Sequence, residues 1–446
     1  MKNNNKLLKL NKDTLPIYLL FGSFLTFSTR GFHDAQENLF NLGNLVRYIS
    51  LPLFYLYTSY LCCKYEFFSI PKISKSITFL FLYWIIGLIS LTNSQWLSYS
   101  IIKWIEYFQI FLLAFYIFNM DRIKVGFTKE VFDIVLNCFE FLMITVLIGA
   151  IFSPSKALYF GSSEYSAIRN ASIPFRLSGY LIPITSTSVG FLSSFLFYNY
   201  LVELANNCKR RLIKVKMLIL LLFIITAQAR MAILGLVIAI FIYYFFINKK
   251  LLYKMATVYI SIVMFMFAGN TILNVILRGQ DFEQIFSLSG RTEWWSYALD
   301  VFSRLNIYEK LFGMGFAGGE KVVAAQSNDA MYTLDSEFLG TLISTGVIGS
   351  ILLMISICYI LLQVIRLRKY NIEMVTNSEN KIYVDQITGI LIILIVRMIT
   401  TNTFSTLSYY SLIYVISVIV IQKIIREIRY EIKYRKNINR NIWYFG

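Results

Sequence analysis

Residues 217–247 form the apolar stretch MLILLLFIITAQARMAILGLVIAIFIYYFFI, in which Arg230 is the single charged residue. A helix that crosses a bilayer needs about 20 consecutive apolar residues, so this stretch is too long for one span and long enough for two short ones. Gln228 and Arg230 interrupt it near its middle. The stretch therefore predicts two short spans in a membrane protein, joined as a tight hairpin or as one interrupted pair.

The composition of the whole chain supports the same class. Of the 446 residues 57% are hydrophobic and only 15% are charged, and the mean hydropathy is +0.61, far above the balance of soluble domains. The apolar runs are continuous, whereas outer-membrane strands would alternate apolar and polar residues. The chain contains only 6 prolines and 22 glycines. We therefore expect an all-α, polytopic integral membrane protein.

Apolar runs predict about twelve transmembrane helices in a single membrane domain, residues 1–446. They lie near residues 15–29, 39–62, 77–93, 99–120, 131–152, 179–204, 217–229, 231–247, 255–277, 336–363, 386–402 and 405–424. The basic and then apolar N-terminus resembles a signal peptide, but it lacks a small-residue cleavage site. We interpret it as a retained first span.

The Lys and Arg residues are concentrated in alternate loops, such as NNCKRRLIKVK, and in the C-terminal tail. The positive-inside rule then predicts a protein of the cytoplasmic (inner) membrane with both termini in the cytoplasm. The net charge of +17 is explained by this topology, so we expect no nucleic-acid partner. Two outer loops are long enough to form structure of their own, residues 153–178 and residues 278–335.

The larger outer loop contains a predicted interfacial helix, RTEWWSYALDVFSRL, preceded by Ser289 and Gly290, which suit a helix start. Its apolar face is predicted to consist of Trp294, Trp295, Ala298, Leu299 and Phe302. Anchoring in the aromatic belt of the membrane is the ordinary role of such a Trp pair. The following FGMGFAGG is rich in glycine, and we expect it to form a flexible loop.

Cations gather at the predicted outer side, against the usual bias. Arg47, Lys103 and Arg397 map to the outer halves of their spans. Nearby outer segments add six arginines: Arg169, Arg176, Arg230, Arg278, Arg291 and Arg304. A guanidinium binds phosphate oxygens in a bidentate manner, so the cluster indicates an anion such as a lipid-linked pyrophosphate. Two simpler explanations stay open: Lys103 and Glu106 neutralise each other on one helix, or the arginines reach lipid phosphates.

Other ionisable residues say little about the function of the protein. Glu140, near the middle of its span, is either a proton-relay residue of a transporter or a satisfied helix-packing contact. The single histidine, His33, lies in the first outer loop, where it is more typical of a solvated residue than of a catalyst. No metal-ligand spacing is present, so we expect neither a metal nor a cofactor.

Three stretches, residues 175–192, 226–236 and 288–349, carry motifs of one known family. Together they resemble the O-antigen polymerase and O-antigen ligase superfamily of bacterial envelope polysaccharide assembly. FRLSGYLIPITSTSVGFL is similar to its Arg-x-x-Gly segment, and TAQARMAILGL to its hairpin motif, with Ala229 where Ser is usual. LSGRTEWWSYALDVF, LFGMGFAGG and LDSEFLGTLISTGVIG are similar to its Ser-Gly-Arg helix, Gly-x-Gly return and following span. The segments occur in the family's order, over roughly residues 165–350.

The resemblance implies a glycosyltransferase that uses undecaprenyl-pyrophosphate-linked oligosaccharides, without a nucleotide sugar or a metal. Arg176, Arg230 and Arg291 match the family's arginine positions, where they would stabilise the leaving pyrophosphate. Arg397 and Arg47 join them as candidate pyrophosphate ligands from the cation pattern. A flippase and a chain-length regulator are partners that the resemblance implies, beside membrane lipid.

Asp335-Ser336 stands where ligases of the family commonly carry His-Asn. This departure favours a Wzy-type polymerase that joins repeat units of a capsule, exopolysaccharide or O-antigen at the outer face of the membrane. An O-antigen-type ligase and a transporter of polysaccharide or lipid-linked sugar are the alternatives. Asp335, and next Glu337, are the candidate general bases, although Asp335 also suits a helix cap. Asp281 and Glu293 are other acids of this loop.

Overall fold

The computed structural model describes residues 11–25, 45–67, 73–159, 175–206, 211–247, 291–326, 334–369 and 378–442. These residues form fifteen α-helices, which confirms the all-α prediction. The first are α1 (Leu15–Gly22), α3 (Leu45–Lys64), α4 (Lys75–Ser90), α5 (Leu97–Ile123), α6 (Phe127–Phe152), α7 (Pro154–Ala157), α9 (Ser186–Ala205) and α10 (Arg211–Ala227). The others are α11 (Arg230–Ile242), α14 (Arg291–Arg304), α15 (Ile307–Phe312), α16 (Gly319–Gln326), α17 (Glu337–Lys369), α19 (Ser378–Met398) and α20 (Tyr409–Ile442).

Short elements connect or extend these helices. The 3-10 helices η1 (Lys12–Thr14) and η3 (Leu91–Asn93) adjoin α1 and α4, and the π-helix η5 (Tyr243–Ile247) continues α11. Strands β1 (Leu158–Tyr159) and β2 (Arg176–Leu177) pair in antiparallel fashion, with Tyr159 opposite Arg176. Both strands belong to the predicted outer loop 153–178, so this loop has local structure.

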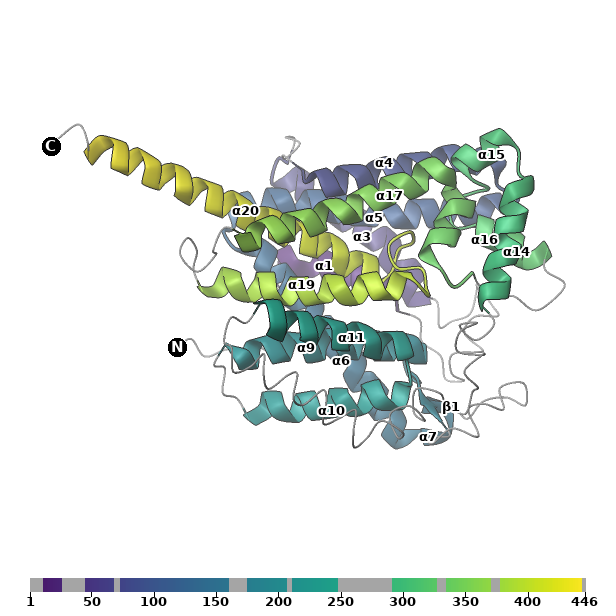
Figure 1. The fold of residues 1–446 in the computed structure, drawn as a ribbon, viewed down its shortest axis with the longest axis horizontal. Coiled ribbons are helices and arrows are strands. Elements are labelled where there is room, and N and C mark those ends of the chain that lie inside the picture. The colour runs from purple at the N-terminus through teal and green to yellow at the C-terminus, as the bar shows by residue number, and fades with distance from the viewer. Residues whose placement is uncertain are drawn as a thin grey trace.

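The long helices lie side by side and form a bundle (Figure 1). Helices α14, α15 and α16 gather at one end of it, which we call the loop end. The C-terminal part of α20 projects from the opposite end, which we call the tail end. Helix α17 runs along α4, and hydrogen bonds among Ser76, Ser356 and the Tyr414 hydroxyl, 2.8–3.1 Å long, tie both helices to α20.

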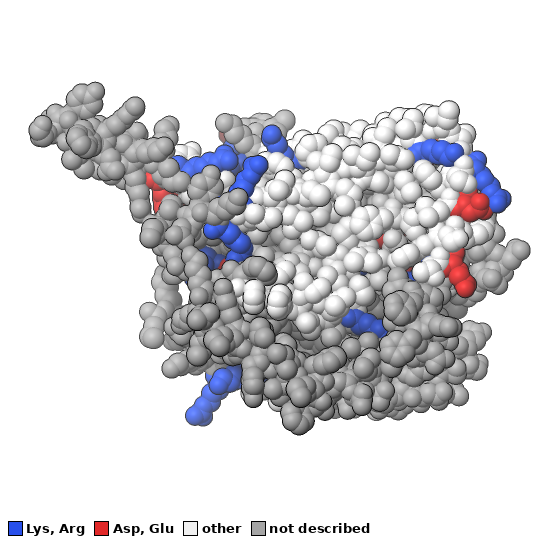
Figure 2. Space-filling model, viewed as in Figure 1, with Lys and Arg blue, Asp and Glu red and all other residues white. Residues whose placement is uncertain are grey.

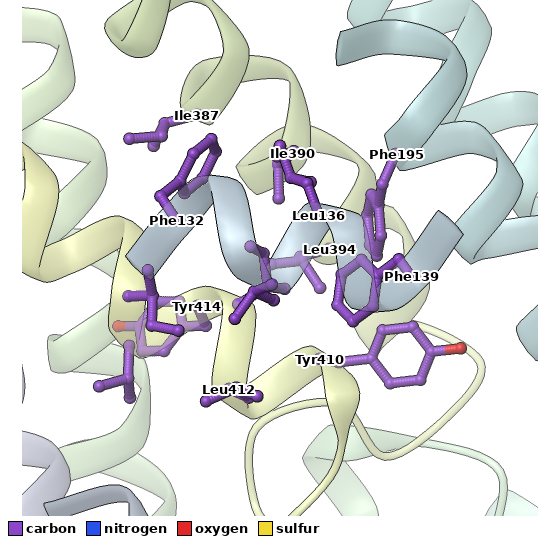
Figure 3. Packing of buried hydrophobic residues seen from close by; sticks show 14 of the residues in the cluster. Phe132, Leu136, Phe139, Phe195, Ile387, Ile390, Leu394, Tyr410, Leu412 and Tyr414 are labelled. Atoms are coloured by element: carbon purple, nitrogen blue, oxygen red, sulfur yellow. The ribbon is translucent and has the colours of Figure 1, made fainter. Parts of the chain in front are cut away.

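Large apolar side chains fill the centre of the bundle. Phe132, Leu136 and Phe139 of α6 lie near Ile390 and Leu394 of α19 (Figure 3), and all five are buried. Lipid tails around a membrane-spanning bundle are as apolar as these side chains, so close van der Waals packing, rather than removal from water, holds the helices together. The ends of the helices are thereby fixed in relation to one another, which positions the side chains at the loop end.

Four helical segments of the described residues are long and apolar enough to cross a membrane: 75–93, 97–123, 127–152 and 337–368. In Figure 2 the surface over the middle of α4 and α17 shows no charged side chains, whereas charges gather toward both ends. The chain therefore has the character of a multi-pass membrane protein. The count of about twelve spans stays a prediction, and the span expected at 255–277 lies outside the described residues.

The predicted interruption within residues 217–247 is confirmed. Helix α10 ends at Ala227 and α11 begins at Arg230. Between them Gln228 has a φ of +50°, a left-handed conformation that breaks a helix. The two helices are therefore joined by a sharp turn, and each of them packs against α9. We call this turn, with Arg230 directly after it, the tip of the α10–α11 hairpin.

Candidate functional site

Helices α14, α15 and α16 cover the first turns of α17 and form a small apolar core with them. Its buried members are Ala298, Met314, Val322, Val323, Leu334 and Ile343. The predicted helix of the large outer loop is confirmed as α14, and Trp294 and Ala298 of the predicted face pack inward. Leu299 of that face is exposed instead, because Tyr297 and Val301 complete the inward face. Helix α14 therefore holds its first residue, Arg291, near the start of α17.

The glycine-rich return FGMGFAGG is packed against α17, so the expectation of a flexible loop was wrong. Gly313 has a φ of +87°, and a Cβ atom there would collide with the backbone of Ser344. The Met314 amide donates a hydrogen bond of 2.8 Å to the Ile343 carbonyl, and α17 is kinked at Gly346. Glycine permits this close approach of two backbones, which places α16 beside the start of α17.

The tip of the α10–α11 hairpin binds the segment that carries Arg176. The side-chain amide of Gln228 donates to the Phe175 carbonyl at 2.8 Å. Nε of Arg176 donates a longer hydrogen bond, 3.5 Å, to the Ala227 carbonyl. Arg230 begins α11 directly after this turn. The structure therefore brings Arg176 and Arg230, which are far apart in the sequence, to one place.

Arg291 connects this pair of arginines to Asp335. Its Nη2 lies 3.0 Å from Oδ2 of Asp335, and the two side chains are 29% and 27% exposed, which leaves them within reach of a ligand. Arg291 is also close enough to Arg230 for electrostatic repulsion. Because α17 begins at Glu337, Ser336 rather than Asp335 takes the position of the helix cap.

Glu337 is buried, with 1% of its surface exposed, and binds the backbone of the α19–α20 loop. Its Oε2 accepts hydrogen bonds from the amides of Thr403 and Phe404, the latter at 3.0 Å, and its Oε1 accepts one from Ser405 at 2.7 Å. Successive backbone amides form an anion-binding concavity of this kind. Both carboxylate oxygens are engaged, so this geometry suits Glu337 to holding the loop.

Arg397, near the end of α19, binds the same loop. Its Nη1 donates to the Asn402 carbonyl and, at 2.8 Å, to the Thr403 hydroxyl, and its guanidinium lies 3.5 Å from the centre of the Tyr410 ring. Arg397 interacts electrostatically with Asp335, but no ion pair within the described ranges includes it. We call Arg176, Arg230, Arg291, Asp335, Glu337 and Arg397 the first cluster.

Glu320 on α16 reaches the same loop. Its Oε1 accepts a hydrogen bond of 2.6 Å from the side-chain amide of Asn402, in space left by the missing side chain of Gly340. Burial raises the pKa of Glu320 to about 8, Glu337 and Asp335 add repulsion, and the Asn402 hydrogen bond opposes the shift. Glu320 therefore keeps its proton at neutral pH.

Arg47 belongs to a different set of contacts. Its Nη2 lies 2.6 Å from Oε1 of Glu106, and Nζ of Lys103 lies 2.8 Å from the other oxygen. The expected Lys103–Glu106 pair is thus present, but one carboxylate serves two cations. Lys321 lies nearby, with its Nζ 3.7 Å from the Tyr99 ring centre, and it interacts electrostatically with Lys103. We call Arg47, Lys103, Glu106 and Lys321 the second cluster.

Sequence reasoning missed Glu320, Lys321 and Asn402. The available signal was that Glu320 and Lys321 directly follow the glycine-rich return. Of the acids considered instead, Glu293 is exposed on α14, and Asp281 lies outside the described residues. No group of three or more His, Cys, Asp or Glu side chains suited to a metal ion occurs in the described part of the chain.

Glu140 lies away from both clusters and has its own partners. It accepts a hydrogen bond from the Tyr200 hydroxyl, and its Oε2 lies 2.7 Å from Nζ of Lys216. A cavity of about 110 Å³ lies beside these side chains and is otherwise lined by apolar residues such as Met143 and Leu196. Of the two alternatives for Glu140, this arrangement favours the helix-packing contact.

One segment of the chain matches a known protein family. It includes the tip of the α10–α11 hairpin, the start of α14 and the start of α17. Residues 215–354 match the O-antigen ligase family, Wzy_C. The resemblance seen in the sequence is thereby confirmed over this segment, and members of Wzy_C are ligases or polymerases that act on lipid-linked sugars. The match includes Arg230, Arg291 and Asp335 but not Arg176 or Arg397. Comparison with curated proteins finds no match.

Proposed function

We propose that the protein is a polymerase that joins undecaprenyl-pyrophosphate-linked oligosaccharide repeat units at the outer face of the cytoplasmic membrane. The observation that carries the proposal is the convergence of Arg176, Arg230 and Arg291 beside Asp335, inside and next to the Wzy_C match. The product would be a capsule, an exopolysaccharide or an O-antigen.

In this proposal the arginines of the first cluster hold the pyrophosphate of the donor. Bond cleavage at the anomeric carbon leaves the bonding electron pair on the pyrophosphate oxygen, so negative charge grows there. Guanidinium groups placed in advance stabilise such charge. Arg397 adds a buried positive charge whose hydrogen bonds go to a carbonyl and a hydroxyl instead of a carboxylate.

Asp335 is the general base of this proposal. Its carboxylate takes the proton of the acceptor hydroxyl as that oxygen attacks the anomeric carbon, and the carbon–pyrophosphate bond breaks. Arg291, at 3.0 Å, holds the Asp335 carboxylate in place. The scheme requires neither a metal nor a cofactor.

Glu337 is a positioning residue in this proposal. Its carboxylate is engaged by three backbone amides of the α19–α20 loop, so it is less suited than Asp335 to accept a proton. The same loop carries Asn402, which binds Glu320, and contacts Arg397. Glu337 would thereby fix the groups around the reaction centre.

The proposal also includes the membrane orientation. We propose that the loop end faces outward and the tail end inward, with about twelve spans, as the basic loops predict. Labelling of single cysteines by an impermeant maleimide tests this: a cysteine at the exposed Asp300 of α14 should react in intact cells. Protection of that cysteine until the cells are opened would contradict it.

A ligase is the second candidate, because the matching family is described by that activity. It would use the same donor and the first cluster in the same way, with an acceptor of another kind. Loss of a ligase would leave lipid-linked polymer, whereas loss of a polymerase would leave single lipid-linked repeat units.

A gel of envelope polysaccharide tests the proposed function. A strain lacking the gene is complemented with the wild type, with Arg291→Ala or with Arg304→Ala, a control on the same helix whose side chain is 77% exposed. We expect the wild type and Arg304→Ala to restore the ladder and Arg291→Ala, inserted at the same level, to leave single repeat units. A ladder that persists without the gene would exclude a polymerase.

A further inference from the structure

Lys321 carries a positive charge that lies outside the first cluster, beside Tyr99 and Trp96. Its Nζ lies 3.7 Å from the Tyr99 ring centre and 5.4 Å from that of Trp96. No carboxylate forms an ion pair with it in the described segments. A partly buried lysine held only by aromatic rings retains most of its capacity to bind an anion.

The rest of the second cluster adds to this excess. Glu106 is 5% exposed in its side chain and binds Arg47 and Lys103 with its two oxygens. One carboxylate thus fixes two cations in place but neutralises only one of their two positive charges. Lys321 interacts electrostatically with Lys103 and adds a third cation to this group, in which Glu106 is the acid that forms ion pairs among the described residues. Such an excess of positive charge favours a ligand with more than one negative charge.

Helix α16 links the second cluster to the first. Glu320 and Lys321 are neighbours in the sequence, yet Glu320 contacts Asn402 whereas Lys321 contacts Tyr99. Glu320 also interacts electrostatically with both Asp335 and Tyr99. From α16, Glu320 therefore reaches the loop that borders the first cluster, whereas Lys321 belongs to the second cluster.

We propose that the cations of the second cluster, Arg47, Lys103 and Lys321, form a second pyrophosphate site, which holds the lipid carrier of the acceptor repeat unit. The inference rests on the proposed function, because a polymerase joins two substrates that each carry a lipid pyrophosphate. The reacting hydroxyl of the acceptor is separated from its own pyrophosphate by sugars. A second anion site outside the first cluster suits that geometry.

The surface around the second cluster suits a lipid-linked ligand. Helices α3 and α5, which carry Arg47 and Lys103, lie side by side, with the Tyr55 hydroxyl 2.5 Å from the Ile105 carbonyl. Both helices expose apolar side chains below the cations, among them Leu56 and Ile105. A polyprenyl chain would remain in apolar surroundings while its pyrophosphate reached the cations.

The stoichiometry of lipid-pyrophosphate binding tests the inference. The probe is undecaprenyl pyrophosphate, titrated into the full-length protein in phosphatidylcholine nanodiscs. We expect two molecules per wild-type protein, one of which is lost in Lys321→Glu and the other in Arg291→Gln. Lys321→Gln should weaken the second site roughly tenfold, as expected for one charge-assisted contact, and Lys321→Arg should retain it. Because Lys321 has no ion-pair partner in the described residues, these variants deprive no existing carboxylate of its cation.

Three results would overturn the inference. They are a single bound molecule in the wild type, two molecules in Lys321→Glu, or displacement of the second molecule by an equal amount of phosphatidylglycerol, which would mark an ordinary headgroup site. None of these results would reject the proposed function, which is tested separately by the effect of Arg291→Gln on binding and on the polysaccharide ladder. A ladder restored by Arg291→Ala would instead reject that function.

Discussion

The two ends of the helix bundle use charge differently. At the tail end, ion pairs match one cation with one carboxylate: Lys423 lies 2.5 Å from Asp121, and Arg368 lies 3.1 Å from Asp385. The first pair joins α20 to α5, and the second joins α17 to α19. Each pair satisfies both partners and holds two helices together.

At the loop end, Arg291 and Arg304 each pair with a carboxylate of their own, but other cations do not. Arg47 and Lys103 share Glu106, and Arg397 donates to a carbonyl and a hydroxyl. Among the described residues the loop end thus holds positive charge that the protein itself does not compensate. The contrast separates charges that stabilise the fold from charges that are placed to bind an anion.

The largest effect is expected for Arg176→Gln. The loss of one group that stabilises the leaving pyrophosphate should lower turnover by about 100- to 1,000-fold, with little change in melting temperature. Its Nε donates a hydrogen bond of 3.5 Å to the Ala227 carbonyl. Turnover on lipid-linked repeat units and thermal melting in detergent measure the two quantities. Equal losses in both would place Arg176 among the structural charges.

The opposite result is expected at the tail end for Lys423→Met. Asp121 is 8% exposed in its side chain, and leaving it without its cation should cost about 2 kcal/mol of stability, while turnover per folded molecule stays unchanged. The double variant Lys423→Met/Asp121→Asn should recover part of the loss, because it also removes the unpaired charge. A turnover defect that persisted in the double variant would contradict a purely structural role for this ion pair.

Glu337→Gln separates positioning from proton transfer. A carboxamide presents only one acceptor oxygen to the three amides that Glu337 now binds, so we expect about 1–2 kcal/mol of destabilisation and a modest fall in turnover. The acid limb of the pH–rate profile should keep its position. A lost acid limb would make Glu337 the general base, and Asp335→Asn is the matched comparison.

The smallest effect concerns Glu320→Gln. The folded pKa of about 8 exceeds the usual value near 4.3, so the folded state binds the proton more tightly. Stability from this group is present in acid and lost as pH rises through 8. Glutamine should therefore stabilise the protein by about 1–2 kcal/mol more at pH 9 than at pH 5, after allowance for partial exposure. A melting temperature difference that is the same at both pH values would contradict the shift.

Local patterns made much of the fold predictable. The break at Gln228 and Arg230, and the amphipathic helix that starts at Arg291, both follow from the spacing of polar and apolar residues and match α10, α11 and α14. The glycine-rich return was misjudged, because the requirement at Gly313 comes from the backbone of α17. The sequence FGMGFAGG by itself does not indicate that this contact with α17 exists.

The candidate site was predictable only in its residue types. The cations were selected by their depth in the spans, but the division into two clusters depends on α16, a helix that was not predicted. Glu320 and Lys321 contact opposite groups, and nothing in two adjacent charged residues indicates this. The binding of Glu337 to the amides of residues 403–405 joins segments far apart in the sequence and was likewise out of reach.

The measurement that tests the central proposal most directly is reconstituted glycosyl transfer. Purified protein in nanodiscs receives the pyrophosphate-linked repeat unit of its own organism, and both the saccharide length and the released lipid pyrophosphate are followed. We predict that the wild type and Lys423→Met form polymer with one lipid pyrophosphate released per linkage, and that Arg291→Ala forms none. Polymer formation by Arg291→Ala at the wild-type rate, or no polymer from the wild type with intact substrate, would contradict the proposal that the loop-end cations carry out this reaction.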